Sequence, residues 1–183
     1  EMCIRDRHKI RWYRGYYSSF DYLIFLLEVY MRRFEIIDRD AFIRDIPNGN
    51  YDDVVLPKRG TISSAGYDFY SVISVTLKPG ERKVIPTGIK VMMNDNEFLG
   101  IFIRSSLGFK YNVRMCNQVG IIDADYYNNS ENEGHIFVCL MNEGDKVLEI
   151  KKGDRIVQGI FMPFLITDDD KTTDIRMGGI GST

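Results

Sequence analysis

From residue 33 onward the chain is a series of short apolar runs, each followed by a turn signal. The clearest runs cover residues 98–103, 135–141, 146–150 and 155–161. They are rich in β-branched and aromatic residues and are bounded by Gly, Asn or Asp, and Pro79-Gly80 separates two further alternating segments. Such runs favour strands, and no long helical periodicity or internal repeat follows residue 45. The pattern predicts an all-β sandwich or barrel.

Composition excludes several other classes of protein. The chain has 183 residues, which suits one domain with tails, and its formal net charge of -2 gives no reason to expect a nucleic-acid surface. The three cysteines have no CxxC spacing, and the two histidines are too few for a histidine-rich metal centre. This cysteine usage argues against a disulfide framework or a zinc site and favours a cytoplasmic protein.

The N-terminal part differs from the rest. Its one apolar run, residues 22–27, is far shorter than the about 20 apolar residues that span a bilayer, so we expect no membrane anchor. No small-residue cleavage site follows it, and residues 2–7 look like translated sequencing-adapter sequence. We expect residues 1–30 to be a short non-native or helical extension, with the natural start at Met31. The β domain should then cover 31–167, and a flexible C-terminal arm 168–183.

Residues 104–110 combine groups that suit phosphate oxygens. Arg104 ends an apolar run, Ser105 and Ser106 follow it, and Gly108 marks an expected turn. The guanidinium offers a planar fork of donors, and the hydroxyls add more. The alternative is a turn with solvated charges, which the spacing alone leaves open.

Residues 117–126 suit a nucleoside. Gly120 permits a positive φ, so a tight hairpin could present its backbone and the Asn117 amide to a base edge. Tyr126 offers a flat face for a sugar. In an extended chain Asp123 and Asp125 share one side, where one carboxylate could polarise a water. The alternative is an acidic turn with the two isoleucines in the core.

Two further segments are weaker signals. Gln158, in residues 153–158, could reach a phosphate or a metal-bound water, although its neighbours are ordinary strand residues. Arg176 precedes the glycine-rich residues 178–181, which could wrap closely around a ligand as a lid. The alternative for this last segment is a disordered glycine tail.

In order and spacing, residues 33–183 resemble the homotrimeric dUTPases, which carry five ordered motifs. The matching segments are residues 65–71, 104–110, 120–126, 153–158 and 176–183. The resemblance implies a distorted jelly-roll β-barrel, a homotrimer with active sites between subunits, and hydrolysis of dUTP to dUMP and diphosphate. It also implies Mg²⁺ held mainly by the substrate phosphates, with water-mediated contacts to Asp68 and Gln158 as an option.

The resemblance also assigns roles to individual residues. Asp123 orients the attacking water, and Asp68 and Asp125 support the site. The residues expected to contact uracil and deoxyribose are Asn117, Gly120, Ile121, Ile122, Tyr126 and Ile180. The residues expected to contact the phosphates are Arg104, Ser105, Ser106, Gln158, Arg176, Gly181 and Ser182.

Three positions depart from the family pattern or separate it from its rivals. Ile180 stands where relatives carry an aromatic residue that stacks on uracil, and residues 127–133 form a longer polar loop than the usual acidic turn. Cys139 stands where the related dCTP deaminases carry their catalytic glutamate, which disfavours deamination. A non-catalytic nucleotide-binding or regulatory protein remains the alternative from another functional class.

Overall fold

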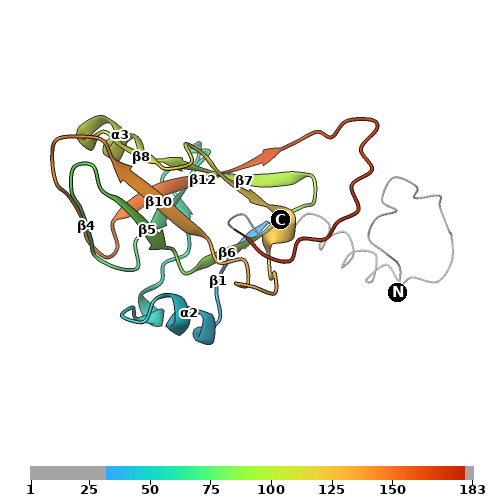
Figure 1. Cartoon of the computed structure of the whole chain (residues 1–183), viewed down its shortest axis with the longest axis horizontal. Coiled ribbons are helices and arrows are strands. Elements are labelled where there is room, and N and C mark those ends of the chain that lie inside the picture. The colour runs from blue at the N-terminus through green and yellow to red at the C-terminus, as the bar shows by residue number, and fades with distance from the viewer. Residues whose placement is uncertain (1–31, 180–183) are drawn as a thin grey trace. The chain divides into compact units, whose positions relative to one another are not determined.

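The computed structural model describes residues 32–179, drawn in colour in Figure 1. The expected extension over residues 1–30 lies outside the described residues, as do Ile180, Gly181 and Ser182 of the predicted arm.

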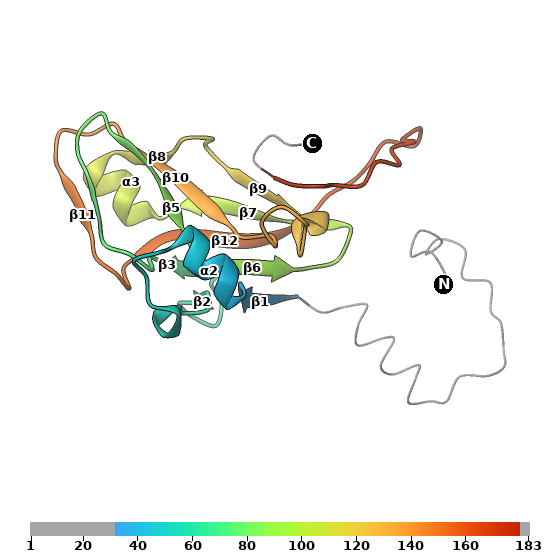
Figure 2. The ribbon, with the colours of Figure 1, turned by 60° about the horizontal axis from the view of Figure 1, so that its bottom comes forward.

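Four antiparallel sheets make up the described chain (Figures 1 and 2). The largest has the order β2 (Lys58–Arg59), β3 (Tyr67–Tyr70), β12 (Arg155–Pro163), β7 (Glu97–Ile103), β9 (Gly120–Asp123). A second has the order β5 (Arg82–Pro86), β10 (Phe137–Asn142), β8 (Val113–Met115). The other two sheets are strand pairs: β1 (Arg33–Ile36) with β6 (Ile89–Met92), and β11 (Leu148–Ile150) with β4 (Val75–Leu77).

The helical elements are short. They are α2 (Arg39–Asp45), α3 (Ser105–Tyr111) and the 3-10 turns η2 (Tyr51–Asp53) and η3 (Ala124–Tyr126). The all-β prediction is confirmed, since the four predicted runs correspond to β7, β10, β11 and β12. One local expectation is wrong: Gly108 lies inside α3 and does not form the turn after Ser106. The turn comes later, where Asn112 adopts φ 51° and its backbone N–H donates to the Gly108 carbonyl.

Alternation along the strands builds the core. In β10 every second residue is buried, so Val138, Leu140 and Asn142 face inward, while Phe137 and Cys139 stay half-buried on the other face. The main hydrophobic cluster includes Phe69, Leu99 and Ile101. Asn142 is tolerated inside because its amide donates to the carbonyls of Leu77 and Lys146 at 2.9 and 2.8 Å, which ties β10 to β4 and to the following turn.

A buried histidine joins α2 to the sheets. The side chain of His135 has no exposed surface, its Nδ1 lies 2.7 Å from the Asp45 carboxylate, and its Nε2 accepts the Gly88 N–H at 2.9 Å. Because Nε2 is an acceptor, the ring is neutral with its proton on Nδ1. Burial lowers the pKa of His135, and the Asp45 carboxylate only partly opposes this shift.

This arrangement predicts an acid-sensitive fold. The folded pKa of His135 is lowered, so below the ordinary value of about 6.5 the unfolded chain binds the proton first and the free energy of unfolding falls. The contribution is complete above that value and is lost as pH falls through the folded pKa. Urea unfolding between about pH 8 and about pH 5 measures it.

The matched variant is His135→Gln, which has an amide in place of the titrating ring. We expect it to be less stable by about 1–3 kcal/mol at neutral pH, because a buried donor or acceptor loses ideal geometry. We also expect a shallower loss of stability on acidification than in the wild type. Parallel curves for the two proteins would contradict this role for His135.

Candidate functional site

A cavity of about 340 Å³ opens between β9 and the β5-β10-β8 sheet. Its size suits part of a small ligand and its wall is largely apolar, with a few polar groups at one side. The lining residues are Val84, Ile101, Met115, Cys116, Asn117, Gly120, Ile121, Ile122, Asp123, Tyr126, Phe137, Cys139 and Arg176. Six of the predicted base, sugar and catalytic residues therefore meet at one cavity, together with Arg176.

The turn between β8 and β9 forms one wall, but not as expected. The residue with a positive φ is Gln118, at 62°, whereas Gly120 is an extended strand residue. Gly120 is needed for space, because a Cβ there would lie 3.2 Å from the Ile101 Cβ and 3.4 Å from the Met115 methyl. The turn is closed by the Gln118 N–H, which donates to the Met115 carbonyl at 3.1 Å. A larger residue at 120 would fill the cavity side of the strand.

Asp123 lines the cavity, but Asp123 and Asp125 do not lie on one extended chain as predicted. Asp123 ends β9, and Asp125 lies in the 3-10 turn η3, so simple alternation does not apply. Arg176 brings the two carboxylates together: its Nη2 lies 2.5 Å from Asp123 Oδ2, and its Nε lies 2.8 Å from Asp125 Oδ1. The arm is therefore folded onto the site in this structure.

The Asp123 carboxyl group has a raised pKa. Burial is the largest cause; the Arg176 charge opposes it, and the nearby Asp125 charge adds to it. A partly desolvated carboxylate with a raised pKa is a better proton acceptor than an ordinary surface aspartate. Among the residues of the cavity rim, Asp123 therefore has the chemistry of a general base.

Tyr126 is held rigidly beside the cavity. Its hydroxyl donates to the His135 carbonyl at 2.9 Å and accepts from the Asn132 amide at 2.7 Å. Burial raises the pKa of this phenol, which keeps it protonated as a donor. Gly179 packs on the ring, since a Cβ there would lie 2.3 Å from a ring carbon. The ring is thus held in a fixed position beside the cavity.

Four of the predicted phosphate residues, Arg104, Ser105, Ser106 and Gln158, lie outside the cavity, whereas Arg176 lines it. The Arg104 guanidinium lies 2.8 Å from Asp68 Oδ1, and the Arg155 guanidinium lies 3.3 Å from Asp68 Oδ2. Gln158 donates weakly to the Ile103 carbonyl at 3.4 Å, and its amide packs against Gly66. Ser105 and Ser106 follow Arg104 and are exposed at the start of α3. Asp68 therefore orients two guanidinium groups.

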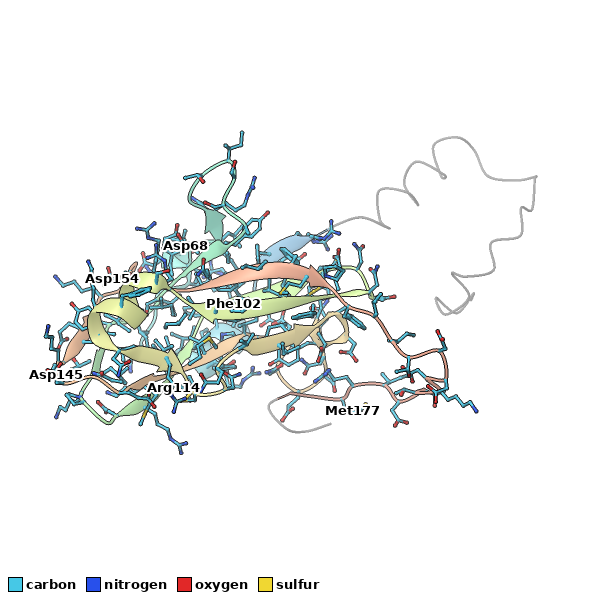
Figure 3. The ribbon with its side chains drawn as sticks, turned by 90° about the horizontal axis from the view of Figure 1, so that it is seen from above. Asp68, Phe102, Arg114, Asp145, Asp154 and Met177 are labelled. Carbon is cyan, nitrogen blue, oxygen red and sulfur yellow. The ribbon has the colours of Figure 1, made fainter. Side chains whose placement is uncertain are left out.

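The two groups lie at opposite ends of β7. Asp123 pairs with Phe98 near the start of this strand, whereas Arg104 follows its last residue. At roughly 3.3 Å per residue, the intervening strand separates their Cα atoms by about 20 Å. Figure 3 agrees: Asp68, on β3 of the same sheet, and Met177 of the arm lie well apart, with Phe102 between them. A single chain does not bring Arg104 to Asp123.

Several cavity residues were not predicted from the sequence. Cys116 and Cys139 lie in its wall with their sulfurs 3.0 Å apart, and the pKa of Cys139 is raised to about 11, chiefly by burial. Val84 and Phe137 complete this apolar side. Alternation in β10 could have indicated Phe137 and Cys139, since both occupy the half-buried face of the strand.

Two properties concern ions and membranes. Within residues 32–179, no group of three or more His, Cys, Asp or Glu side chains is placed to hold a metal ion by itself. No helix in the same range is long and apolar enough to span a membrane.

Comparisons with known proteins give one consistent result. The family model for dUTPase matches residues 52–183. The deoxyuridine 5'-triphosphate nucleotidohydrolase of Lactococcus lactis is 48% identical over 130 residues, covering 70% of this chain and 87% of that protein. The corresponding protein of Haemophilus influenzae is 36% identical over 150 residues, covering 78% of this chain and 94% of its own length.

Solved structures agree with the sequences. The crystal structure of dUTPase from Streptococcus mutans has a TM-score of 0.63 and 41% identity, covering 74% of this chain and 98% of that one. A variant of the dUTPase from Staphylococcus aureus phage phi11, described with a structural Mg(II) ion, has a TM-score of 0.59 at 17% identity and so supports the fold alone; it covers 79% of this chain and 98% of its own. The predicted dUTPase-like jelly roll is confirmed, and the chain belongs to the dUTPase family.

Proposed function

We propose that this chain hydrolyses dUTP to dUMP and diphosphate, with Asp123 orienting the attacking water. The observation that carries the proposal is the position of Asp123, a carboxylate with a raised pKa at the rim of a cavity lined by Asn117 and the β9 backbone. Attack on a phosphoryl group needs positioning and charge neutralisation more than covalent chemistry by the protein. The relatives from Lactococcus lactis and Haemophilus influenzae carry the matching name.

The cavity supports selection for uracil and deoxyribose. Asn117 and the backbone of residues 120–122 supply donors and acceptors for a base edge, and Tyr126 supplies the flat surface for the sugar. An added Cβ at Gly120 would lie 3.2 Å from the Ile101 Cβ and 3.4 Å from the Met115 methyl, so the wall is closely packed here and we expect it to leave little room for a 5-methyl group. Cys139 places a protonated thiol, not a carboxylate, on the cavity wall, which disfavours deamination.

A complete site needs phosphate-binding residues that come from a second copy of the chain. Arg104 lies about 20 Å along β7 from Asp123 of the same chain, and Ser105 and Ser106 follow it. Gln158, opposite Phe102 on β12, lies about 13 Å along β7 and on its other side from β9, so these side chains do not act beside Asp123 of the same chain. The sheet face between the two groups is apolar: the Phe102 ring and the Met162 sulfur both lie against Gly100, and Met162 is 37% exposed. An apolar face of this kind suits subunit contact. We propose the homotrimer with shared sites.

Magnesium fits the phosphate side of this arrangement. Mg²⁺ prefers to keep several waters and to bind through substrate phosphates with one or two carboxylates nearby, so it does not require a protein cage. Asp68 and Gln158 are the side chains that would contact its waters. When bound, the ion neutralises charge on the phosphate oxygens. Residues of this chain supply the rest. Arg104 binds phosphate, Asp68 orients the Arg104 guanidinium, and Asp123 orients the water.

A cytoplasmic location is part of the proposal. The three cysteines without CxxC spacing support it, because such usage suits a reducing compartment.

The first test is Asp123→Asn, measured by pyrophosphate release and by dUTP binding. The amide keeps the size of the side chain but is a poor proton acceptor, so turnover should fall roughly 10²-fold or more while binding is retained. Asp145→Asn, at an exposed turn remote from the cavity, is the matched control. Near-wild-type turnover in Asp123→Asn would remove this residue from the mechanism.

The second test is the acid limb of the pH profile of kcat/KM, which reports the pKa of the free enzyme's base. Because burial raises the pKa of Asp123, activity should fall at a pH above the ordinary aspartate value of about 3.9. The Arg176 charge lowers that pKa, so Arg176→Gln should move the limb to still higher pH. Arg39→Gln, which loses an exposed ion pair with Asp52, should leave it in place. A limb that does not move in Arg176→Gln would contradict this coupling.

The third test asks whether the site is shared. Asp123→Asn and Arg104→Ala chains should each be nearly inactive alone, because each lacks one half of every site. After the two are unfolded and refolded together, about one quarter of the shared sites combine two intact halves, so activity should reappear. Activity no greater than the sum of the separate variants would place both halves in one chain.

A further inference from the structure

Residues 127–134 form a self-supporting loop between η3 and β10. The Asn129 side chain organises it: its Oδ1 accepts the N–H groups of Glu131 and Asn132, both at 3.1 Å, and its amide donates to the Tyr126 carbonyl at 2.8 Å. Asn129 is buried although its neighbours Asn128 and Ser130 are exposed. The loop therefore has a fixed shape set by its own polar side chains.

The 127–134 loop is also pinned to the β1-β6 pair. The buried Lys90 ammonium donates to Asn128 Oδ1 at 2.8 Å and forms a close ion pair with Glu133. The Glu133 carboxylate in turn accepts the Asp38 N–H at 3.0 Å. Tyr127 donates from its hydroxyl to a Glu35 carboxylate oxygen at 2.6 Å. These contacts give the loop a rigid base.

The outer side of the 127–134 loop contacts the C-terminal arm. Ser130 Oγ donates to the Met177 carbonyl at 3.0 Å, and Glu131 Oε2 accepts the Gly179 N–H at 3.0 Å. Gly179 lies on the Tyr126 ring, which the loop itself holds through Asn132. Met177 is labelled on this part of the arm in Figure 3. Both hydrogen bonds use backbone groups of the arm, so they do not depend on its side chains.

The rest of the arm has little that would hold it. Leu165 is 97% exposed and Ile175 is 82% exposed, so the approach to Arg176 buries almost no apolar surface. By contrast, Gly178 and Gly179 are buried where they meet the loop and the Tyr126 ring. The contacts at residues 177 and 179 directly follow Arg176, whose guanidinium lies on Asp123 and Asp125.

We propose that the 127–134 loop is the docking platform of the C-terminal arm, and that Ser130 and Glu131 are positioning residues that hold Arg176 at the site. The kinetic consequence rests on the proposed function, whereas the docking itself does not. Docking through backbone groups gives the arm a means of closure other than stacking of an aromatic ring, which matters in a chain with Ile180 at the stacking position.

The experiment compares Ser130→Ala, Glu131→Ala and the conservative Glu131→Gln, whose Oε1 can still accept the Gly179 N–H. Glu149→Ala is the control, because Glu149 is an exposed glutamate on β11 that also accepts one hydrogen bond, from Thr76. The first readout is the rate of tryptic cleavage after Lys171 and Arg176 in the nucleotide-free protein, followed by mass spectrometry. The second is KM and kcat for dUTP, and thermal unfolding verifies that each variant is folded.

We expect Ser130→Ala and Glu131→Ala to be cleaved several-fold faster in the arm and to have a raised KM, with Glu131→Gln and Glu149→Ala close to wild type. Unchanged cleavage in Glu131→Ala would overturn the docking. Faster cleavage with unchanged KM and kcat would overturn the positioning role. If the wild type does not hydrolyse dUTP, the proposed function fails, and the cleavage rates alone decide the docking.

Discussion

The pairing of β7 with β9 on one side and β12 on the other is the constraint on which the site depends. It places Gly120 opposite Ile101 and Asp123 opposite Phe98, while Gln158 lies opposite Phe102. A shift of one residue in the β7-β9 register would turn Asp123 to the other face of the sheet. The same strand therefore sets both the position of the carboxylate and its distance from the residues proposed to bind phosphate.

That separation is the reason for the proposed assembly. The cavity and the Arg104 group are each well formed within one chain, with Arg104 oriented by Asp68, yet they do not meet there. If the site is divided between copies, activity depends on correct assembly, because a lone subunit holds only part of the charged groups that a triphosphate needs. The apolar face around Phe102 and Met162 is where the copies would meet.

Polar contacts around the cavity perform different tasks. His135 and Asn142 stabilise the fold through buried hydrogen bonds, and Asn129 and Asn132 shape the loop that supports Tyr126. Among the carboxylates of residues 32–179, only Asp123 combines partial burial, a raised pKa and a place in the cavity lining. The buried polar residues thus hold the structure around Asp123. Substitutions of these residues should change stability, whereas substitutions of Asp123 should change turnover.

The sequence predicted the parts of this account that depend on local pattern. Alternating residues located the strands, and the five ordered segments located the candidate site and its family. Local pattern failed where tertiary contacts decide the backbone: Gly120 is required for space and not for a positive φ, Gly108 lies within α3, and η3 ends the extended chain after Asp123. Contacts between segments far apart in sequence, such as Arg176 with Asp123 and Ser130 with Met177, have no signature in spacing.

Pyrophosphate release from a panel of dUTP, dCTP, dTTP and UTP, with Mg²⁺ present, tests the central claim most directly. A cavity walled by Asn117, Gly120 and Met115 beside a carboxylate at Asp123 predicts rapid release from dUTP and little from the other three nucleotides. Comparable release from dTTP or UTP would contradict the assigned base and sugar contacts. Conversion of dCTP to dUTP, or no turnover of any of the four, would contradict the proposed reaction itself.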